Sequence, residues 1–143
     1  LTACESAAPP PIDTCDAATN AFYAAFNGRE PASAARLAYR GQEGRGFNPV
    51  LYETMWGKSE FVATGTLRTY DGEPLLARLD GPRTLFIGGQ YDEARPDTLE
   101  GFARRVAGAE FAVVPGAAHG IFSDRPAETL GLLRGWLARK DAA

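Results

Sequence analysis

Histidine and cysteine are scarce in this sequence, and their scarcity limits the chemistry that it can carry. The 143 residues include one histidine, His119, and two cysteines, Cys4 and Cys15. A site that needs a pair of histidines is therefore excluded. Two cysteines are also too few for a zinc site built on cysteine or for a disulfide-rich scaffold.

A serine nucleophile of the usual hydrolase type is also missing. The chain has four serines, which are Ser6, Ser33, Ser59 and Ser123. None of them lies in a G-x-S-x-G sequence. That pattern forms the sharp turn that presents the nucleophile of an α/β-hydrolase. The sequence therefore lacks the element on which a complete serine hydrolase of this type depends.

An excess of positive charge and a long apolar run are absent as well. Lysine and arginine number 15 against 18 acidic residues, which leaves a net charge of -3 and no overall basic footprint for nucleic acid. No apolar run approaches the roughly 20 residues that cross a bilayer, so we expect no membrane span. With 45% hydrophobic residues, the composition is that of an ordinary globular chain with one modest core.

The two cysteines leave the redox state and the compartment open. Cys4 and Cys15 are compatible with a disulfide in an oxidising compartment and with two free thiols in the cytoplasm, because sequence carries no bond geometry. We slightly favour a cytoplasmic location over a periplasmic or secreted one.

Residues 1–79 predict short helices without strands between them. Asp13, Thr14 and Asp16 are candidate N-caps for a helix over 17–26, and Asn27-Gly28 is a typical helix stop. Further short helices are expected over 32–39 and over 50–56, the latter after an Asn-Pro cap. This pattern suits a helical lid rather than a parallel sheet.

Residues 80–143 predict an α/β unit. Apolar strands are expected over 83–89 and 110–114, a helix begins at 96–97 and ends before 108, and a final helix spans 124–140. Strands that alternate with helices pair in parallel. Because two such strands do not form a stable open sheet, we expect this chain to be the C-terminal part of a larger protein.

Two residues that can exchange protons follow the two expected strands. Asp92 comes shortly after the first strand and His119 after the second. The carboxyl ends of parallel strands lie at one edge of a sheet, where functional groups collect. A carboxylate there can hold an imidazole in the tautomer that a general base requires, and α/β-hydrolases use the chain order Asp then His. Taken singly, each residue is more often a solvated loop side chain.

Two longer runs resemble the proline iminopeptidase family. The run M-W-G-K-S-E-F over 55–61 and the turn G-Q-Y-D-E over 89–93 are its most specific elements, and the similarity extends from about Phe22 to the C-terminus. Members of this family are α/β-hydrolase aminopeptidases with a helical cap. The resemblance implies part of that cap over 1–79 and the last strands and helices of the hydrolase domain over 80–143.

The same resemblance implies roles for individual residues. Asp92 resembles the acid of the catalytic triad and His119 its general base. Glu93 and Glu60 resemble the acidic residues that receive the substrate's N-terminal ammonium, since charge-assisted hydrogen bonds strengthen in a water-poor cleft. Tyr52 resembles a cap residue that lines that pocket.

Four aromatic residues are candidates for an apolar slot that would take a proline ring. They are Trp56, Phe61, Phe22 and Phe26. Aromatic side chains at helical spacing are more often plain core, and we interpret Phe22 and Phe26 in that way. Glu60 and Glu93 have surface interpretations of their own, as a glutamate beside a helix and as a first-turn helix charge.

The sequence therefore predicts part of a serine aminopeptidase that acts by acyl transfer without a metal or organic cofactor. The expected partners are the N-terminal half of the same hydrolase, which carries the serine, and a small peptide or amino-acid derivative with a free N-terminus. Two alternatives stay open. One is an amino-acid amidase, esterase or acyltransferase of the same fold, and the other is a non-catalytic binding subunit.

Overall fold

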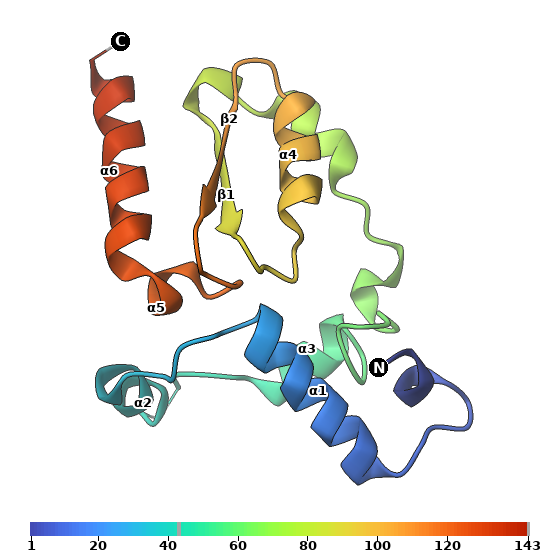
Figure 1. Cartoon of the computed structure of the whole chain (residues 1–143). Helices are drawn as coiled ribbons and strands as arrows, with labels where there is room; N and C mark the ends of the chain where they lie inside the picture. Colours follow the sequence, from blue (N-terminus) through green and yellow to red (C-terminus); the bar gives the residue numbers. More distant parts are fainter. Residues whose placement is uncertain (43, 143) are drawn as a thin grey trace. The chain divides into compact units, whose positions relative to one another are not determined.

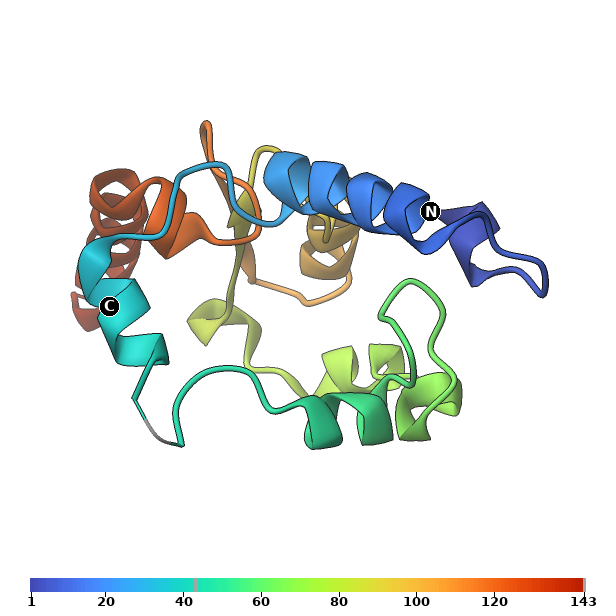
Figure 2. The ribbon, with the colours of Figure 1, turned by 90° about the horizontal axis from the view of Figure 1, so that it is seen from below.

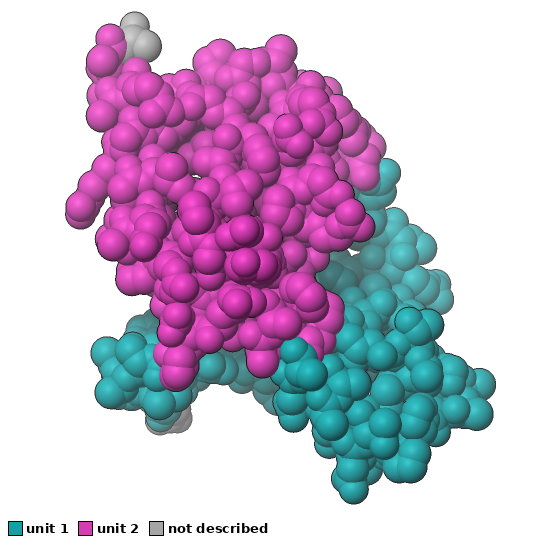
Figure 3. Space-filling view, viewed as in Figure 1, with its two compact units in different colours: residues 1–21, 32–72 teal, residues 22–31, 73–143 magenta. Residues whose placement is uncertain are grey.

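Residues 1–42 and 44–142 are described by the computed structural model, in which the chain divides into two units (Figure 3). Unit 1 combines Leu1–Ala21 with Ala32–Gly72. Unit 2 combines Phe22–Pro31 with the chain from Glu73 onward. The division between lid and hydrolase domain expected at residues 79 and 80 stays a prediction.

Unit 1 is built from helices, as its sequence predicts. They are the 3₁₀ helix η1 (Thr2–Glu5), the helix α1 (Ile12–Phe26), whose last turn lies in unit 2, then α2 (Ala34–Arg40), α3 (Pro49–Met55) and η2 (Thr66–Thr69). The Ser33 and Asn48 side chains accept from the backbone N–H groups of Arg36 and Leu51 at 3.2 and 3.1 Å, and so cap α2 and α3.

The first helix begins earlier than its sequence predicts. The Pro11 carbonyl accepts from Thr14 N at 3.0 Å and from Cys15 N at 3.3 Å, which closes the first turn of α1 before the expected caps. Asp13, Thr14 and Asp16 therefore lie inside the helix, where their backbone groups take part in the helical ladder. The expectation of a start at residue 17 is wrong for this reason.

Of the two states left open for the cysteines, the structure contains the disulfide. Cys4 of η1 and Cys15 of α1 are bonded, with their Cα atoms 5.7 Å apart. The bond joins η1 to the first turns of α1 and buries Cys15. It closes a loop with a sequence separation of 11 residues.

Unit 2 contains the predicted α/β arrangement. Its elements from residue 73 are η3 (Glu73–Arg78), η4 (Gly81–Arg83), β1 (Leu85–Gly89), α4 (Pro96–Arg104), β2 (Glu110–Val114), α5 (Ile121–Asp124) and α6 (Pro126–Asp141). The two strands are parallel, and their register runs from Leu85 opposite Glu110 to Gly89 opposite Val114. Helices α4 and α6 lie on opposite sides of the strands (Figures 1 and 2).

The final helix α6 agrees with the expected span of 124–140 to within two residues, and the short helix α5 that precedes it is not predicted by the sequence. Arg125 adopts φ -142° and ψ 67°, which ends α5, and Pro126 opens α6. The ring of a proline disfavours the helical conformation at the preceding residue, and proline suits the first position of a helix. The break at Arg125 follows from that local rule.

The core of unit 2 lies beyond the carboxyl end of β2. Val114, Ala117 and Ile121 are buried together, with Ile87 of β1 packed against them. Gly89 ends β1 where the backbone of the next turn is so near that an added Cβ would lie 2.2 Å from the Ala118 oxygen. Only glycine permits that approach, which brings the turn before His119 against the end of β1.

Two further properties concern the described residues as a whole. Within residues 1–42 and 44–142, each helix is too short or too polar to cross a lipid bilayer. In the same part of the chain, no three side chains of histidine, cysteine, aspartate or glutamate come together in a group suited to a metal ion.

Candidate active site

Asp92 and His119 meet beyond the carboxyl ends of the two strands. His119 Nδ1 lies 2.9 Å from Asp92 Oδ1. The Asp92 side chain is 4% exposed and the imidazole is 54% exposed. The juxtaposition expected from the sequence is confirmed by this distance, because β1 and β2 are neighbours and both turns start from one edge of the sheet.

Backbone groups fix the carboxylate. Asp92 Oδ2 accepts from Gly89 N at 3.2 Å, and Oδ1 accepts from Ala94 N at 2.8 Å. An ionised carboxylate only accepts hydrogen bonds, so its contact with His119 requires the proton on Nδ1. In the neutral imidazole with this tautomer, His119 Nε2 has a lone pair, which is what a general base needs.

The C-terminal end of α1 joins the two turns. The Phe26 carbonyl accepts from both Glu93 N, at 3.2 Å, and His119 N, at 3.0 Å, and the Asn27 carbonyl accepts from Gly120 N at 2.8 Å. The last carbonyls of a helix have no partner within the helix, so they are available for such bonds. Phe26 and Asn27, which we call the Phe26–Asn27 corner, thus hold the Asp92–Glu93 turn and the His119 turn together.

Asp124 is a second structural carboxylate, and its position at the start of the expected final helix does not predict this role. It is 3% exposed and accepts from the backbone N–H groups of Ala118, at 2.8 Å, and of Arg29 and Glu30, each at 3.0 Å. Burial alone would raise its pKa, but these backbone donors outweigh burial and lower the pKa. Asp124 therefore fastens the turn before His119 to the segment that follows α1.

Asn27 is the other residue whose role the sequence did not indicate. Its Nδ2 donates to Glu93 Oε1 at 2.7 Å, across a separation of 66 residues. An asparagine before glycine at the end of a helix is an ordinary stop signal, and α1 does end there. A sequence pattern that extends over a few residues cannot predict a contact with a residue so distant in sequence.

A small pocket lies beside the two carboxylates. It has a volume of about 220 Å³, and its walls are Phe22, Phe26, Asp92, Glu93 and Arg95. Phe26 is 41% exposed, so the expectation that it is a core residue is wrong. The last turn of α1 lies over the ends of the strands and their turns, where its rings border a pocket instead of filling an interior.

Tyr52, Trp56 and Glu60 belong to unit 1, and the structure describes them there. Tyr52 and Trp56 are half-buried and line one pocket of about 280 Å³. Burial, and then the charge of the neighbouring Glu60, raise the pKa of the Tyr52 phenol. Glu93, Asp92 and His119 belong to unit 2, so the structure describes these two groups of residues separately.

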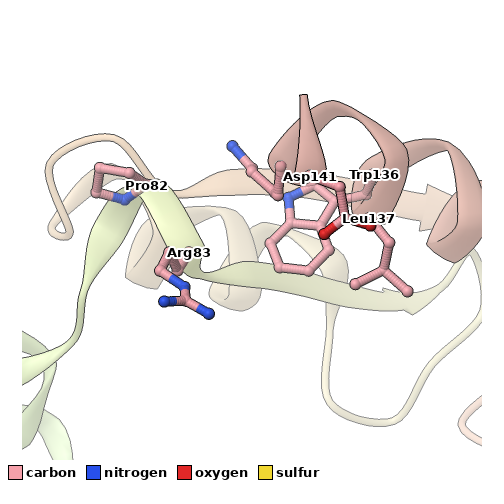
Figure 4. A pocket seen from close by; sticks show the side chains of 6 residues that line it. Pro82, Arg83, Trp136, Leu137 and Asp141 are labelled. Carbon is pink, nitrogen blue, oxygen red and sulfur yellow. The ribbon is translucent and has the colours of Figure 1, made fainter. Parts of the chain in front are cut away.

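A larger pocket of unit 2 has no such chemistry. It has a volume of about 470 Å³ and is lined by residues of α6 and of the segment that leads into β1, among them Pro82, Arg83, Trp136 and Leu137 (Figure 4). It lies at the start of β1, whereas Asp92 follows the end of that strand. The site is therefore assigned to the smaller pocket, where a carboxylate–imidazole pair is present.

Comparison with known proteins finds proline iminopeptidases among the proteins that this chain is similar to. No family model matches the chain. A proline iminopeptidase of Levilactobacillus brevis is 38% identical over 90 residues, which are 63% of this chain and 30% of that protein. A proline iminopeptidase of Heyndrickxia coagulans is 32% identical over 90 residues, 63% of this chain and 31% of that protein.

A solved structure agrees with these relatives. The crystal structure of proline iminopeptidase from Mycobacterium smegmatis matches 92% of this chain and 47% of its own, with a TM-score of 0.71 and 26% identity. The chain spans about 30% of the length of the curated relatives that it matches. It therefore has the fold of part of an α/β-hydrolase and is related in sequence to the proline iminopeptidases.

Proposed function

We propose that this chain supplies the acid and the base of a serine aminopeptidase that releases an N-terminal residue, preferentially proline. The nucleophilic serine would belong to a companion segment outside these 143 residues. The observation that carries the proposal is the hydrogen bond between buried Asp92 and exposed His119, at 2.9 Å beyond two parallel strands. The relatives named above support the choice of an aminopeptidase among hydrolases of this fold.

In the proposed reaction, His119 moves one proton twice. Its Nε2 takes the proton of the serine hydroxyl as the serine oxygen bonds to the substrate carbonyl carbon. Asp92 stabilises the imidazolium that forms. His119 then gives this proton to the leaving amine as the carbon–nitrogen bond breaks, and water attacks the acyl group by the same path in reverse. These steps need no metal or organic cofactor.

The proposed recognition of the substrate depends on charge. A free N-terminus is a cation, and Glu93 directly follows Asp92 on the same turn, so an ammonium on its carboxylate would lie a fixed distance from the triad. The pocket beside Phe22 and Phe26 would take the side chain of that residue. The proposed roles of Glu60, Tyr52 and Trp56 in substrate binding depend on the sequence resemblance.

The test uses the protein that contains this chain together with the segment that carries the proposed serine. Hydrolysis of L-proline p-nitroanilide is measured for the wild type, His119→Ala and Asp92→Asn. We expect kcat to fall by roughly 10³- to 10⁴-fold in each variant, because each loses the base or its tautomer. Amino-acid amides and esters, assayed in parallel, separate an aminopeptidase from an amidase or esterase of the same fold.

Glu100→Gln is the matched control. Glu100 is an exposed carboxylate on α4 outside the pocket, and it pairs with Arg104 at 3.0 Å. We expect its kcat to stay within about twofold of the wild type, since exposed ion pairs contribute little. Full activity in His119→Ala would refute the proposed division of the triad.

A further inference from the structure

The Asn27 side chain contacts Glu93, and the proposed reaction assigns no role to this contact. Its Nδ2 donates to Glu93 Oε1 at 2.7 Å, and both residues are half-buried. A carboxylate has about four acceptor positions, and this bond occupies one of them. The remaining positions can receive the N–H groups of an ammonium, so the contact orients Glu93 without consuming its capacity.

The backbone of Asn27 is held firmly enough to serve as such a support. Its N–H donates to the Tyr23 carbonyl at 3.0 Å, and its carbonyl accepts from Gly120 N at 2.8 Å. Glu93 N is bonded to the adjacent Phe26 carbonyl at 3.2 Å. The backbone and the side chain of Glu93 are therefore both bonded to the Phe26–Asn27 corner, which reduces the number of rotamers that this long side chain samples.

The chemistry of the amide also suits this task. Asn27 is neutral, so its contact with Glu93 adds no positive charge that would compete with a substrate ammonium. The cation that lines the same pocket, Arg95, pairs instead with Asp97. A lysine or arginine in place of Asn27 would orient Glu93 equally well but would neutralise it before substrate arrives.

We propose that Asn27 is a positioning residue that holds the Glu93 carboxylate in place to receive the substrate's ammonium. In this way Asn27 sets the preference for a free over a blocked N-terminus. The inference rests on the proposed function and deepens it, since it names the residue that makes Glu93 selective for a free ammonium.

A double-mutant cycle tests the inference on the protein that contains this chain and the serine-bearing segment. Asn27→Ala, Glu93→Gln and the double variant are assayed on L-proline p-nitroanilide and on the blocked N-acetyl-L-proline p-nitrophenyl ester. For Asn27→Ala we expect KM on the free-amine substrate to rise about tenfold, with kcat nearly unchanged, because a bond to a charged group is lost. The blocked ester should be hydrolysed as by the wild type.

The coupling between the two positions is the decisive readout. If Asn27 acts through Glu93, the double variant loses no more free-amine selectivity than Glu93→Gln alone. If the double variant instead loses free-amine selectivity by the product of the two single losses, the two residues act independently and the inference is wrong. Asn20→Ala, an exposed asparagine on the same helix, is the matched control and should leave both substrates unaffected.

A second variant covers the case in which Asn27→Ala does not fold. Asn27→Leu keeps the volume of the side chain but removes its donor to Glu93 Oε1, so it should also lose free-amine selectivity while it hydrolyses the blocked ester. If Glu93→Gln abolishes the selectivity and neither Asn27 variant changes it, the inference alone is wrong. If the wild type itself shows no free-amine selectivity, the proposed function fails and the inference fails with it.

Discussion

Unit 1 and unit 2 differ in what holds them in shape. Unit 2 has a buried interior that includes Val114 and Ala117 and the charged groups Asp92 and Asp124. Among the described residues of unit 1, Cys15 alone is buried. Large apolar side chains of unit 1 are exposed instead, among them Ile12, Leu37, Phe47, Val50, Leu51 and Tyr70.

This difference shows that the two units owe their order to different forces. In unit 2, apolar burial and buried hydrogen bonds act together, and they also position Asp92 and His119. In unit 1, helix caps at Ser33 and Asn48 and the Cys4–Cys15 disulfide stabilise the helices, and Ser59 Oγ donates to Glu5 Oε1 at 2.7 Å across 54 residues. Disturbing one of these interactions in each unit should therefore affect different parts of the chain.

The largest effect is expected from Asp124→Ala. The substitution leaves three backbone N–H groups of unit 2 without their acceptor, and that of Ala118 is buried, which should cost about 3 kcal/mol of unfolding free energy. Amide hydrogen exchange should accelerate in β1 and β2, while the amides of α3 serve as the reference. An equal acceleration in α3 would contradict the comparison between the units.

The charge of Asp124 gives this prediction a pH dependence. Its pKa is lowered in the folded state, so the stabilisation is present above the ordinary carboxyl pKa of about 4 and is lost as the pH falls through the folded-state pKa. Asp124→Asn, which keeps an acceptor and cannot ionise, is the control. The difference in unfolding free energy between wild type and Asp124→Asn should be larger at pH 6 than at pH 3, and a constant difference would refute the role of the charge.

An intermediate effect is expected from removal of the disulfide in unit 1. Replacing Cys4 and Cys15 by serine opens a loop with a sequence separation of 11 residues, which should cost about 2 kcal/mol. Exchange should accelerate in η1 and in the first turns of α1, and not in β1 and β2. Mass-resolved hydrogen exchange with and without a reductant checks this, and acceleration confined to unit 2 would reverse the comparison.

The smallest effect is expected from Asn48→Ala at the start of α3. The variant loses the side-chain acceptor for Leu51 N, which should cost about 1 kcal/mol, local to unit 1. Asn48→Asp retains an acceptor and should restore most of the loss. Thermal unfolding of the three proteins measures the effect, and a loss in Asn48→Asp equal to that in Asn48→Ala would exclude the cap as its cause.

Much of the fold could be predicted from local signals. The strand over 110–114 agrees with β2, and the Asn48 cap and the parallel α/β order are confirmed. These features depend on side-chain alternation, on helix ends and on strand order, all of which act over a few residues. The wrong predictions concern helix ends, where several nearby residues could each start or stop the helix. Examples are the early start of α1 at Ile12 and the break before Pro126.

For the candidate site, the sequence by itself determined that Asp92 and His119 would lie at one sheet edge, because parallel strands bring their carboxyl ends together. Only the tertiary structure decided what supports them. Asn27 contacts Glu93 across 66 residues of sequence, and Asp124, which lies close to His119, binds the backbone of Arg29 across 95. The patterns that predict helices and strands extend over a few residues, whereas a hydrogen bond between distant segments depends on how the whole chain packs.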